Sequence, residues 1–400
     1  MKDREHRFVF ELPVAFLFDT YRELVVSSAD CHPIAHASFV NKTPLLGLEL
    51  SIMPVHSRKS GICHVLAVFL LPCMSFCAAR ILFGLLRNSP KPSFKEWCQE
   101  GDTSMTPARL AYIGHDAFDS RMCIIVAFMR EALDGGRAKF FSEFYATFGP
   151  SAIAPFIEMR RAGYRIPVVL VSMLVLGILY QFLTGAVILP LWWTIHLLSS
   201  GRNAVALHPH YVEGTFIGYL FGYLFVSIAL VTSQTIAVNV LWQIFPISIV
   251  IVQSFYLAYQ RYAHGDAPEC SYEVLQLIHI TNFCWSTITH AYTAFQILRS
   301  NAPLDSLKHA YHPTFSPSSL SPPTSAAQRF LKWDIIFITG STLFAGLWFL
   351  RGARPRLLAI GWFILGTLFF GGGAALSGIW MWREKVLEED RRVAKQSKAN

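Results

Sequence analysis

The chain has 400 residues, of which 53% are hydrophobic and only 15% are charged, and its formal net charge is +8. Soluble domains carry about 25% charged residues, so this composition argues against a cytosolic globular protein and against disorder along the whole chain. The basic residues flank apolar runs and do not alternate with stacking aromatic side chains, so we expect no nucleic-acid partner.

Apolar runs long enough to cross a bilayer determine the expected fold class. A membrane-spanning helix needs about 20 mostly apolar residues. In chain order such runs occupy residues 62–79, 165–190, two stretches between 214 and 260, 274–298, 332–350 and 357–382. The sequence therefore predicts an all-α integral membrane bundle of about seven transmembrane helices over residues 62–382, in contact with the lipid bilayer.

Two of these runs contain polar or aromatic residues that refine the prediction. The second is too long for one span, so we expect its helix to end near Pro190 and to continue along the membrane interface through Trp192, Trp193 and His196. Polar residues at 232–239 mark the expected turn between the third and fourth spans.

The segments between and beyond the spans are less apolar. Residues 87–165 begin with a Pro/Ser/Lys loop, and helical spacing follows over 106–132 and again up to Phe144, which predicts helices that lie at the membrane interface or cap the bundle. Residues 302–328 are rich in Pro and Ser without periodicity and predict a disordered linker. Residues 1–61 have no readable structure, and residues 383–400 form a basic tail.

Charge placement predicts the orientation. With seven spans, the Lys- and Arg-rich segments 87–165, 299–332 and 383–400 fall on one side, which the positive-inside tendency makes cytoplasmic. We therefore expect a multi-pass protein of the endoplasmic reticulum with a lumenal N-terminus and a cytoplasmic C-terminus. The Arg-rich turn at 351–356 opposes this orientation.

The eight cysteines include no CxxC pair. Their scattered positions favour small buried apolar side chains over a zinc site or a disulfide framework.

Several catalytic motifs are absent from the sequence: a P-loop, a GxSxG elbow, an HExxH pair and a DDxxD cluster. Without an acidic cluster there is no evident site for magnesium and a prenyl diphosphate. We therefore expect no metal and no cofactor, and an enzyme of this kind would use acid–base chemistry on a lipid-like substrate.

Ionisable groups near the ends of the spans are the candidate catalytic groups, because charge at membrane depth is costly and often functional. They are Glu158, Glu213 and Asp334. The alternative for each is an interfacial carboxylate that touches headgroups or pairs with a nearby cation, and for Glu158 the neighbouring Arg160 is the expected partner. Uncharged polar residues inside the spans, such as Gln181 and Gln243, either bond between helices or contact a substrate.

Five segments together resemble a known family. They are Ile157–Gly163, Tyr180–Trp192 with His196, Trp242–Pro246, Leu331–Asp334, and Gly371–Ala374 followed by Trp382-Arg383-Glu384. In this order they resemble the fungal multi-pass membrane terpene cyclases of the ascofuranone and macrophorin pathways, over residues 105–395.

The resemblance implies a membrane-bound terpene cyclase of secondary metabolism, with isomerase or lyase chemistry. Such an enzyme protonates an olefin or epoxide of a sesquiterpenoid or meroterpenoid precursor. The catalytic candidates are then Asp334, Glu158 and, next, Glu213. Burial can keep such an acid protonated near neutral pH. If the second and sixth spans are neighbours, Asp334 and Glu158 should face one chamber.

The residues expected to contact the prenyl substrate are Gln181, Trp242, Gln243, Trp333 and His196. Two alternatives remain open from the sequence: a non-enzymatic seven-span receptor or transporter of a small hydrophobic molecule, and another membrane enzyme acting on prenyl or acyl chains.

Overall fold

The computed structural model describes residues 61–87, 98, 112–133, 138–199, 206–263, 271–315, 326–350 and 352–399, and the structural statements below concern these residues. Every regular element in them is a helix, which confirms the all-α fold class. The elements are α2 (Gly61–Arg87), α4 (Asp116–Leu133), α5 (Ala138–Arg161), α6 (Ile166–Leu183), α7 (Gly185–Ser199), α8 (Pro209–Tyr219), the π-helical turn η2 (Leu220–Leu224), α9 (Phe225–Ser233), α10 (Ile236–Gln243), α11 (Phe245–Ala263), α12 (Ser271–Leu298), α13 (Pro303–Tyr311), α14 (Ala326–Phe349), α15 (Ala353–Phe370) and α16 (Gly372–Ala399). The predicted segment 1–61 lies outside the described residues except for Gly61.

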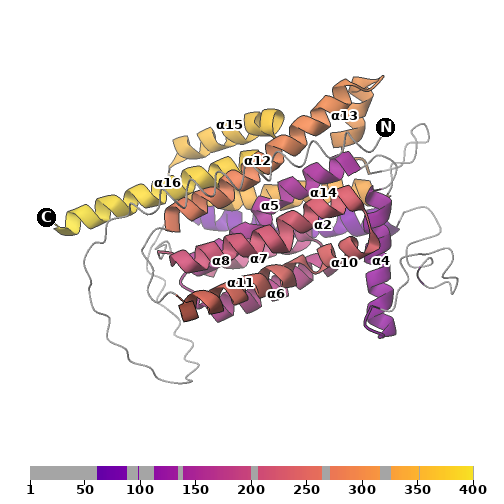
Figure 1. Cartoon of the computed structure of the whole chain (residues 1–400). Helices are drawn as coiled ribbons and strands as arrows, with labels where there is room; N and C mark the ends of the chain where they lie inside the picture. Colours follow the sequence, from indigo (N-terminus) through magenta and orange to yellow (C-terminus); the bar gives the residue numbers. More distant parts are fainter. Residues whose placement is uncertain are drawn as a thin grey trace.

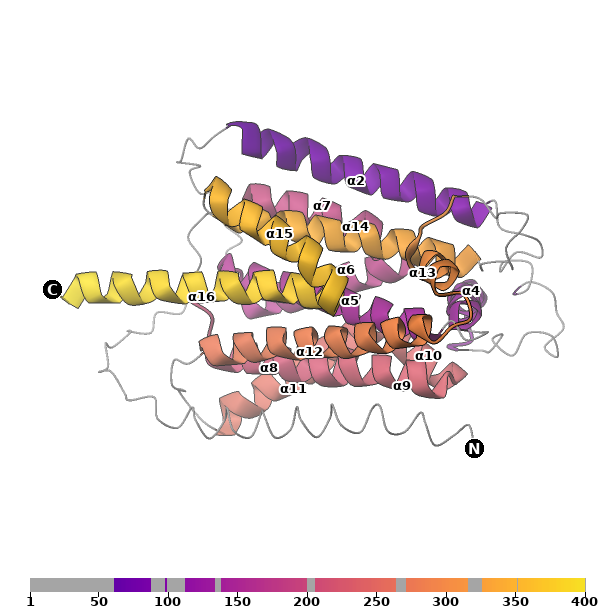
Figure 2. The ribbon, with the colours of Figure 1, turned by 90° about the horizontal axis from the view of Figure 1, so that it is seen from above.

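Most helices run along one long axis and form an elongated bundle (Figures 1 and 2). Helix α4 crosses one end of the bundle steeply, and the C-terminal end of α16 projects from the opposite end. Five described helices are long and apolar enough to cross a membrane, or six if the bent pair α10–α11 counts as one span. Helix α12 covers the predicted fifth run with 28 residues but is less apolar and is not counted among them.

Helix α5 forms the centre of the bundle and contacts α6, α12, α14 and α16. Every residue from Phe140 to Met159 is buried. The expectation of an interfacial helix ending near Phe144 was therefore wrong. A helix enclosed by other helices does not contact lipid, so it needs no long apolar run. Polar residues can therefore occur in α5, and they interrupt the apolar pattern by which a span is recognised in the sequence.

The run predicted as one long second span is a helical hairpin. It reverses at Thr184, which has a φ of 73°, between α6 and α7. Helix α7 then packs between α2 and α14, so closely that a Cβ on Gly185 would lie 2.6 Å from Ile338 Cδ1. Trp193 is fully buried. The expected interfacial extension is thus a helix that buries Trp193 and His196 within the bundle and leaves Leu191, Ile195 and Leu198 exposed.

The predicted turn between the third and fourth spans is confirmed at Gln234 and Thr235, where the Thr235 side chain caps α10. Asn239, expected in that turn, instead lies within α10. A second break follows at Ile244, where α10 and α11 meet at an angle of 68°.

The last predicted span, 357–382, is broken at Gly371, whose φ is 90°. Helices α15 and α16 pack side by side there, and the Trp362 Nε1–H donates to Ala375 O over 2.9 Å. Helix α16 continues through most of the predicted basic tail to Ala399.

The reversals at Thr184 and Gly371 change which helix ends lie at the same end of the bundle. The expectation that residues 299–332 and 383–400 share one side was wrong, because α13 and the end of α16 lie at opposite ends of the bundle (Figure 2). Helix α2 runs antiparallel to α14, with Phe83 near Phe330 and Met74 near Gly340. The start of α2 therefore lies at the same end of the bundle as the end of α16.

The predicted disordered linker 302–328 contains a helix. In α13 the Tyr311 hydroxyl donates to Glu143 Oε2 over 2.6 Å, which attaches this segment to α5. Residues 316–325 of the linker lie outside the described part of the chain.

A disulfide joins Cys98 to Cys123 of α4. Cys73 and Cys77 are exposed rather than buried. The expectation of burial was therefore wrong for Cys73 and Cys77. Cys98 and Cys123 are buried as expected, but they are paired, because pairing 25 residues apart depends on how the chain returns to α4 and not on a local motif.

Candidate functional site

A cavity of about 360 Å³ lies inside the end of the bundle that α4 crosses. This volume is in the range of small-molecule sites. Its walls come from α2, α4, α5, α6, α10, α11 and α14 and from the tip of the α6–α7 hairpin. The lining residues are Phe83, Leu86, Ile124, Ile125, Phe128, Met129, Phe144, Phe148, Tyr180, Gln181, Phe182, Thr184, Gly185, Trp242, Gln243, Phe245, Phe330, Leu331, Asp334 and Ile338.

Aromatic side chains dominate this lining, with nine of the twenty residues being Phe, Tyr or Trp. Their rings support one another: Phe148 meets Tyr180 and Phe245 edge-on, with ring centroids 6.2 and 6.0 Å apart. The Trp242 Nε1–H donates to Ser227 Oγ over 3.1 Å, which fixes the indole. The walls are therefore apolar and ordered, and they present ring faces that attract a positive charge.

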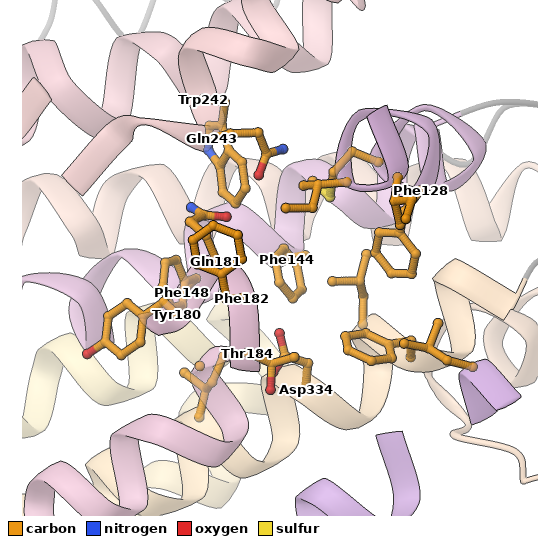
Figure 3. Close-up of a pocket in the computed structure, with 18 of the residues that line it drawn as sticks. Phe128, Phe144, Phe148, Tyr180, Gln181, Phe182, Thr184, Trp242, Gln243 and Asp334 are labelled. Atoms are coloured by element: carbon orange, nitrogen blue, oxygen red, sulfur yellow. The ribbon is translucent and has the colours of Figure 1, made fainter. Parts of the chain in front are cut away.

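Asp334 supplies the only carboxyl group of the lining. It is 6% exposed and comes from the first half of α14. Its Oδ1 accepts a hydrogen bond from the Ala186 N–H at the start of α7, over 2.9 Å. In Figure 3 the carboxyl group lies at the floor of the cavity, beside Thr184 and below Phe144.

The structure brings together four of the eight residues expected at the site. Asp334, Gln181, Trp242 and Gln243 all line this cavity, although they come from three distant segments of the chain. The hairpin tip brings Gln181 to the cavity, and the bend after α10 brings Trp242 and Gln243 there.

The other four expected residues lie elsewhere. Trp333 is half-buried and packs against Phe315, with ring centroids 4.7 Å apart. Glu213 is 35% exposed, lies 3.2 Å from His210 Nδ1 and accepts a hydrogen bond from the Tyr256 hydroxyl. His196 stacks on Trp192 at 4.8 Å.

Glu158 belongs to a buried ion network at the far end of α5. Its oxygens accept two hydrogen bonds from Arg383, at 2.6 and 2.7 Å, and one from Arg161 at 3.2 Å. Arg161 also binds Glu384, at 2.7 and 2.8 Å. All four side chains are 6% exposed or less.

Two guanidinium groups donate hydrogen bonds to Glu158, and paired cations favour the ionised form of a carboxyl group. This arrangement suits an ion pair, whereas a proton donor must hold a proton. The expectation that Glu158 and Asp334 face one chamber was wrong. Arg160 is not its partner and instead donates to the Tyr164 carbonyl oxygen.

Sequence reasoning missed the contribution of α5 to the cavity, because α5 itself was not recognised. Phe144 and Phe148 are one helical turn apart, and this spacing was the available signal. It also missed two ion pairs, Glu158 with Arg383 and Arg161 with Glu384. Each pair joins residues more than 200 positions apart. Among the described residues, no group of three or more His, Cys, Asp or Glu side chains could hold a metal ion.

Comparison with known protein families matches the CtvD domain over residues 69–388, which includes every residue of the cavity and of the ion network. No curated protein matches the chain, and no solved structure does.

Proposed function

Because the chain belongs to the CtvD domain family, a fungal terpene cyclase-like family of secondary metabolism, we propose that it is a membrane-bound terpene cyclase. It starts the cyclisation of a prenyl chain by proton transfer from Asp334. The observation that carries this proposal is a single buried carboxyl group inside a cavity whose other lining residues are uncharged and mostly aromatic or aliphatic. The substrate class is a sesquiterpenoid or meroterpenoid precursor or its terminal epoxide.

The surroundings of Asp334 suit a proton donor. An apolar cavity favours the uncharged form of a carboxyl group, so the proton is retained until a substrate arrives. When the proton moves to an olefin or an epoxide oxygen, the carboxylate that remains accepts the Ala186 N–H at the N-terminus of α7. A helix N-terminus stabilises negative charge, so this contact favours the state formed by proton transfer.

The rest of the lining suits the cation that follows. Protonation of an olefin places positive charge on carbon. Unlike an ammonium group, a carbocation carries no N–H or O–H, so the protein cannot stabilise it by accepting a hydrogen bond. Ring faces such as those of Phe148, Trp242 and Phe245 stabilise such a charge electrostatically. Apolar walls also limit the water that would quench the cation before ring closure.

The test is turnover by membranes from a host that expresses the full chain. Farnesyl phenols and their terminal epoxides are supplied, and cyclic products are followed by mass spectrometry. Asp334→Asn should lower turnover by at least about 10²-fold, because general acids contribute roughly that factor or more. Asp305→Asn on the exposed α13 is the matched control and should leave turnover unchanged.

Turnover should also persist in a chelator, since the lining offers one carboxyl group and no acidic cluster for magnesium. Full activity of the Asp334→Asn protein would contradict the proposal. Saturable binding of these substrates without any product would instead indicate a receptor or a transporter.

A further inference from the structure

A chain of amide groups links the cavity to the backbone of α4. The Asn239 Nδ2 donates to the carbonyl oxygen of Val126 over 3.3 Å. A carbonyl oxygen can only accept, so the NH₂ group of Asn239 must face Val126 and its Oδ1 must face away. That Oδ1 lies 3.0 Å from Gln243 Nε2 and accepts its hydrogen. The Val126 carbonyl therefore determines the orientation of both amides.

The consequence is that Gln243 directs its acceptor oxygen away from Asn239 and toward the cavity. One N–H of its NH₂ group is held by Asn239, and its Oε1 has no hydrogen-bond partner among the described residues. The side chain is 5% exposed. In Figure 3 the Gln243 oxygen points into the cavity, across the space from Asp334. A buried acceptor left without a donor is costly, so this position favours a ligand that supplies one.

We propose that Gln243 Oε1 binds a hydroxyl group of the substrate and accepts its hydrogen. The identification of that substrate as a prenyl compound rests on the function proposed above. The expected class is then a prenyl alcohol or prenylated phenol with a free O–H, held at Gln243 while another part of the chain reaches Asp334. An ether or an ionised diphosphate fits less well, because each offers only acceptor oxygens to an acceptor.

The test compares a matched pair of probes, farnesol and farnesyl methyl ether, which differ in the O–H donor. Their binding to the purified full chain in detergent is followed by tryptophan fluorescence, since Trp242 lines the cavity. The alcohol donates a hydrogen bond to Gln243 Oε1, whereas the ether leaves this oxygen without a donor. The dissociation constant of the alcohol should therefore be about tenfold lower than that of the ether. Gln243→Met, which keeps the size of the side chain, should reduce this preference to about one.

Two further variants keep the test informative if Gln243→Met does not fold. Asn239→Leu removes the group that orients the Gln243 amide, so the preference should fall while Gln243 remains. Gln276→Met is the matched control: this glutamine donates to the Met381 carbonyl oxygen outside the cavity, and the preference should stay about tenfold.

Equal or undetectable binding of the two probes to the wild-type protein would overturn the inference. A loss of preference in Gln276→Met as large as in Gln243→Met would also overturn it. Binding needs no turnover, so the outcomes for the two proposals are separate. A protein that prefers the alcohol but cyclises nothing contradicts the function alone, and an active cyclase without the preference contradicts only this inference.

Discussion

Two carboxyl groups within this bundle have opposite surroundings. Glu158 accepts hydrogen bonds from two guanidinium groups, whereas Asp334 accepts one backbone N–H and faces apolar side chains. Paired cations hold a carboxylate in its ionised form, and an apolar cavity favours the neutral acid. Of the two groups, only Asp334 is therefore suited to donate a proton, and Glu158 connects α5 to α16.

We predict that Glu158→Gln lowers stability rather than blocking chemistry. It would remove the two short hydrogen bonds between Arg383 and Glu158 and leave the buried guanidinium only its 3.3 Å contact with Glu384. Breaking a buried ion pair costs about 3–5 kcal/mol. Thermal unfolding of the purified protein in detergent should show a lower midpoint. The double variant Glu158→Gln with Arg383→Met should lose less than the sum of the two single variants, because no unpaired charge remains from this pair.

Normal unfolding of Glu158→Gln together with lost turnover would contradict this structural role and return Glu158 to the catalytic candidates.

At the scale of helices, the contact between η2 and α11 depends on the small size of Gly222. A Cβ on this residue would lie 2.5 Å from the backbone nitrogen of Ile249, and backbone cannot move aside as a flexible side chain can. Gly222→Ala should therefore destabilise the protein by about 1–3 kcal/mol, the usual cost of overpacking. Chemical denaturation followed by circular dichroism measures this.

Gly361→Ala is the control for that measurement, because a Cβ on this α15 residue would meet nothing within 4 Å. It should be neutral or slightly stabilising, since Ala has the higher helix propensity. Equal losses in the two variants would show that the close approach of η2 and α11 is not needed.

Helix α4 closes one end of the cavity, and its attachment is covalent as well as polar. It contributes Ile124, Ile125, Phe128 and Met129 to the lining, and Cys123 ties it to Cys98. Replacing both cysteines with serine should increase cleavage around α4 in limited proteolysis, because a disulfide closing a loop of this length contributes about 3 kcal/mol. The wild-type protein treated with reductant should show the same pattern, and an unchanged pattern in both would contradict this role.

For the whole molecule, the disulfide and the basic helix α16 indicate one orientation. Disulfides persist in oxidising compartments, so we propose that the α4 end of the bundle, which holds the Cys98–Cys123 disulfide, faces the lumen of the endoplasmic reticulum. The end of α16 carries Lys385, Arg391 and Arg392 and lies at the opposite end, where basic residues favour the cytoplasm. The disulfide and the basic residues of α16 agree in the orientation that they favour, because the chain reverses at Thr184 and Gly371 and so places them at opposite ends of the bundle.

We therefore predict that a tag after residue 400 is removed by protease added to intact microsomes. A glycosylation sequon placed in the exposed α13, at the α4 end of the bundle, should be modified in the same preparation. A protected tag, or a sequon that is modified only when it is moved to the tail, would reverse the orientation.

The sequence by itself determined the helical class and the membrane-type architecture, and it pointed to Asp334, Gln181, Trp242 and Gln243 as candidates, which line one cavity. Each of these depends on local properties: the length of an apolar run, the cost of a polar group within it, and short motifs. Tertiary structure alone decided where the long runs reverse, at Thr184 and Gly371, because an uncharged stretch satisfies a bilayer whether it continues or folds back. It also decided that α5 lies at the centre and that Glu158 is paired, because burial by other helices replaces lipid as the surrounding medium and contacts across 200 residues leave no local pattern.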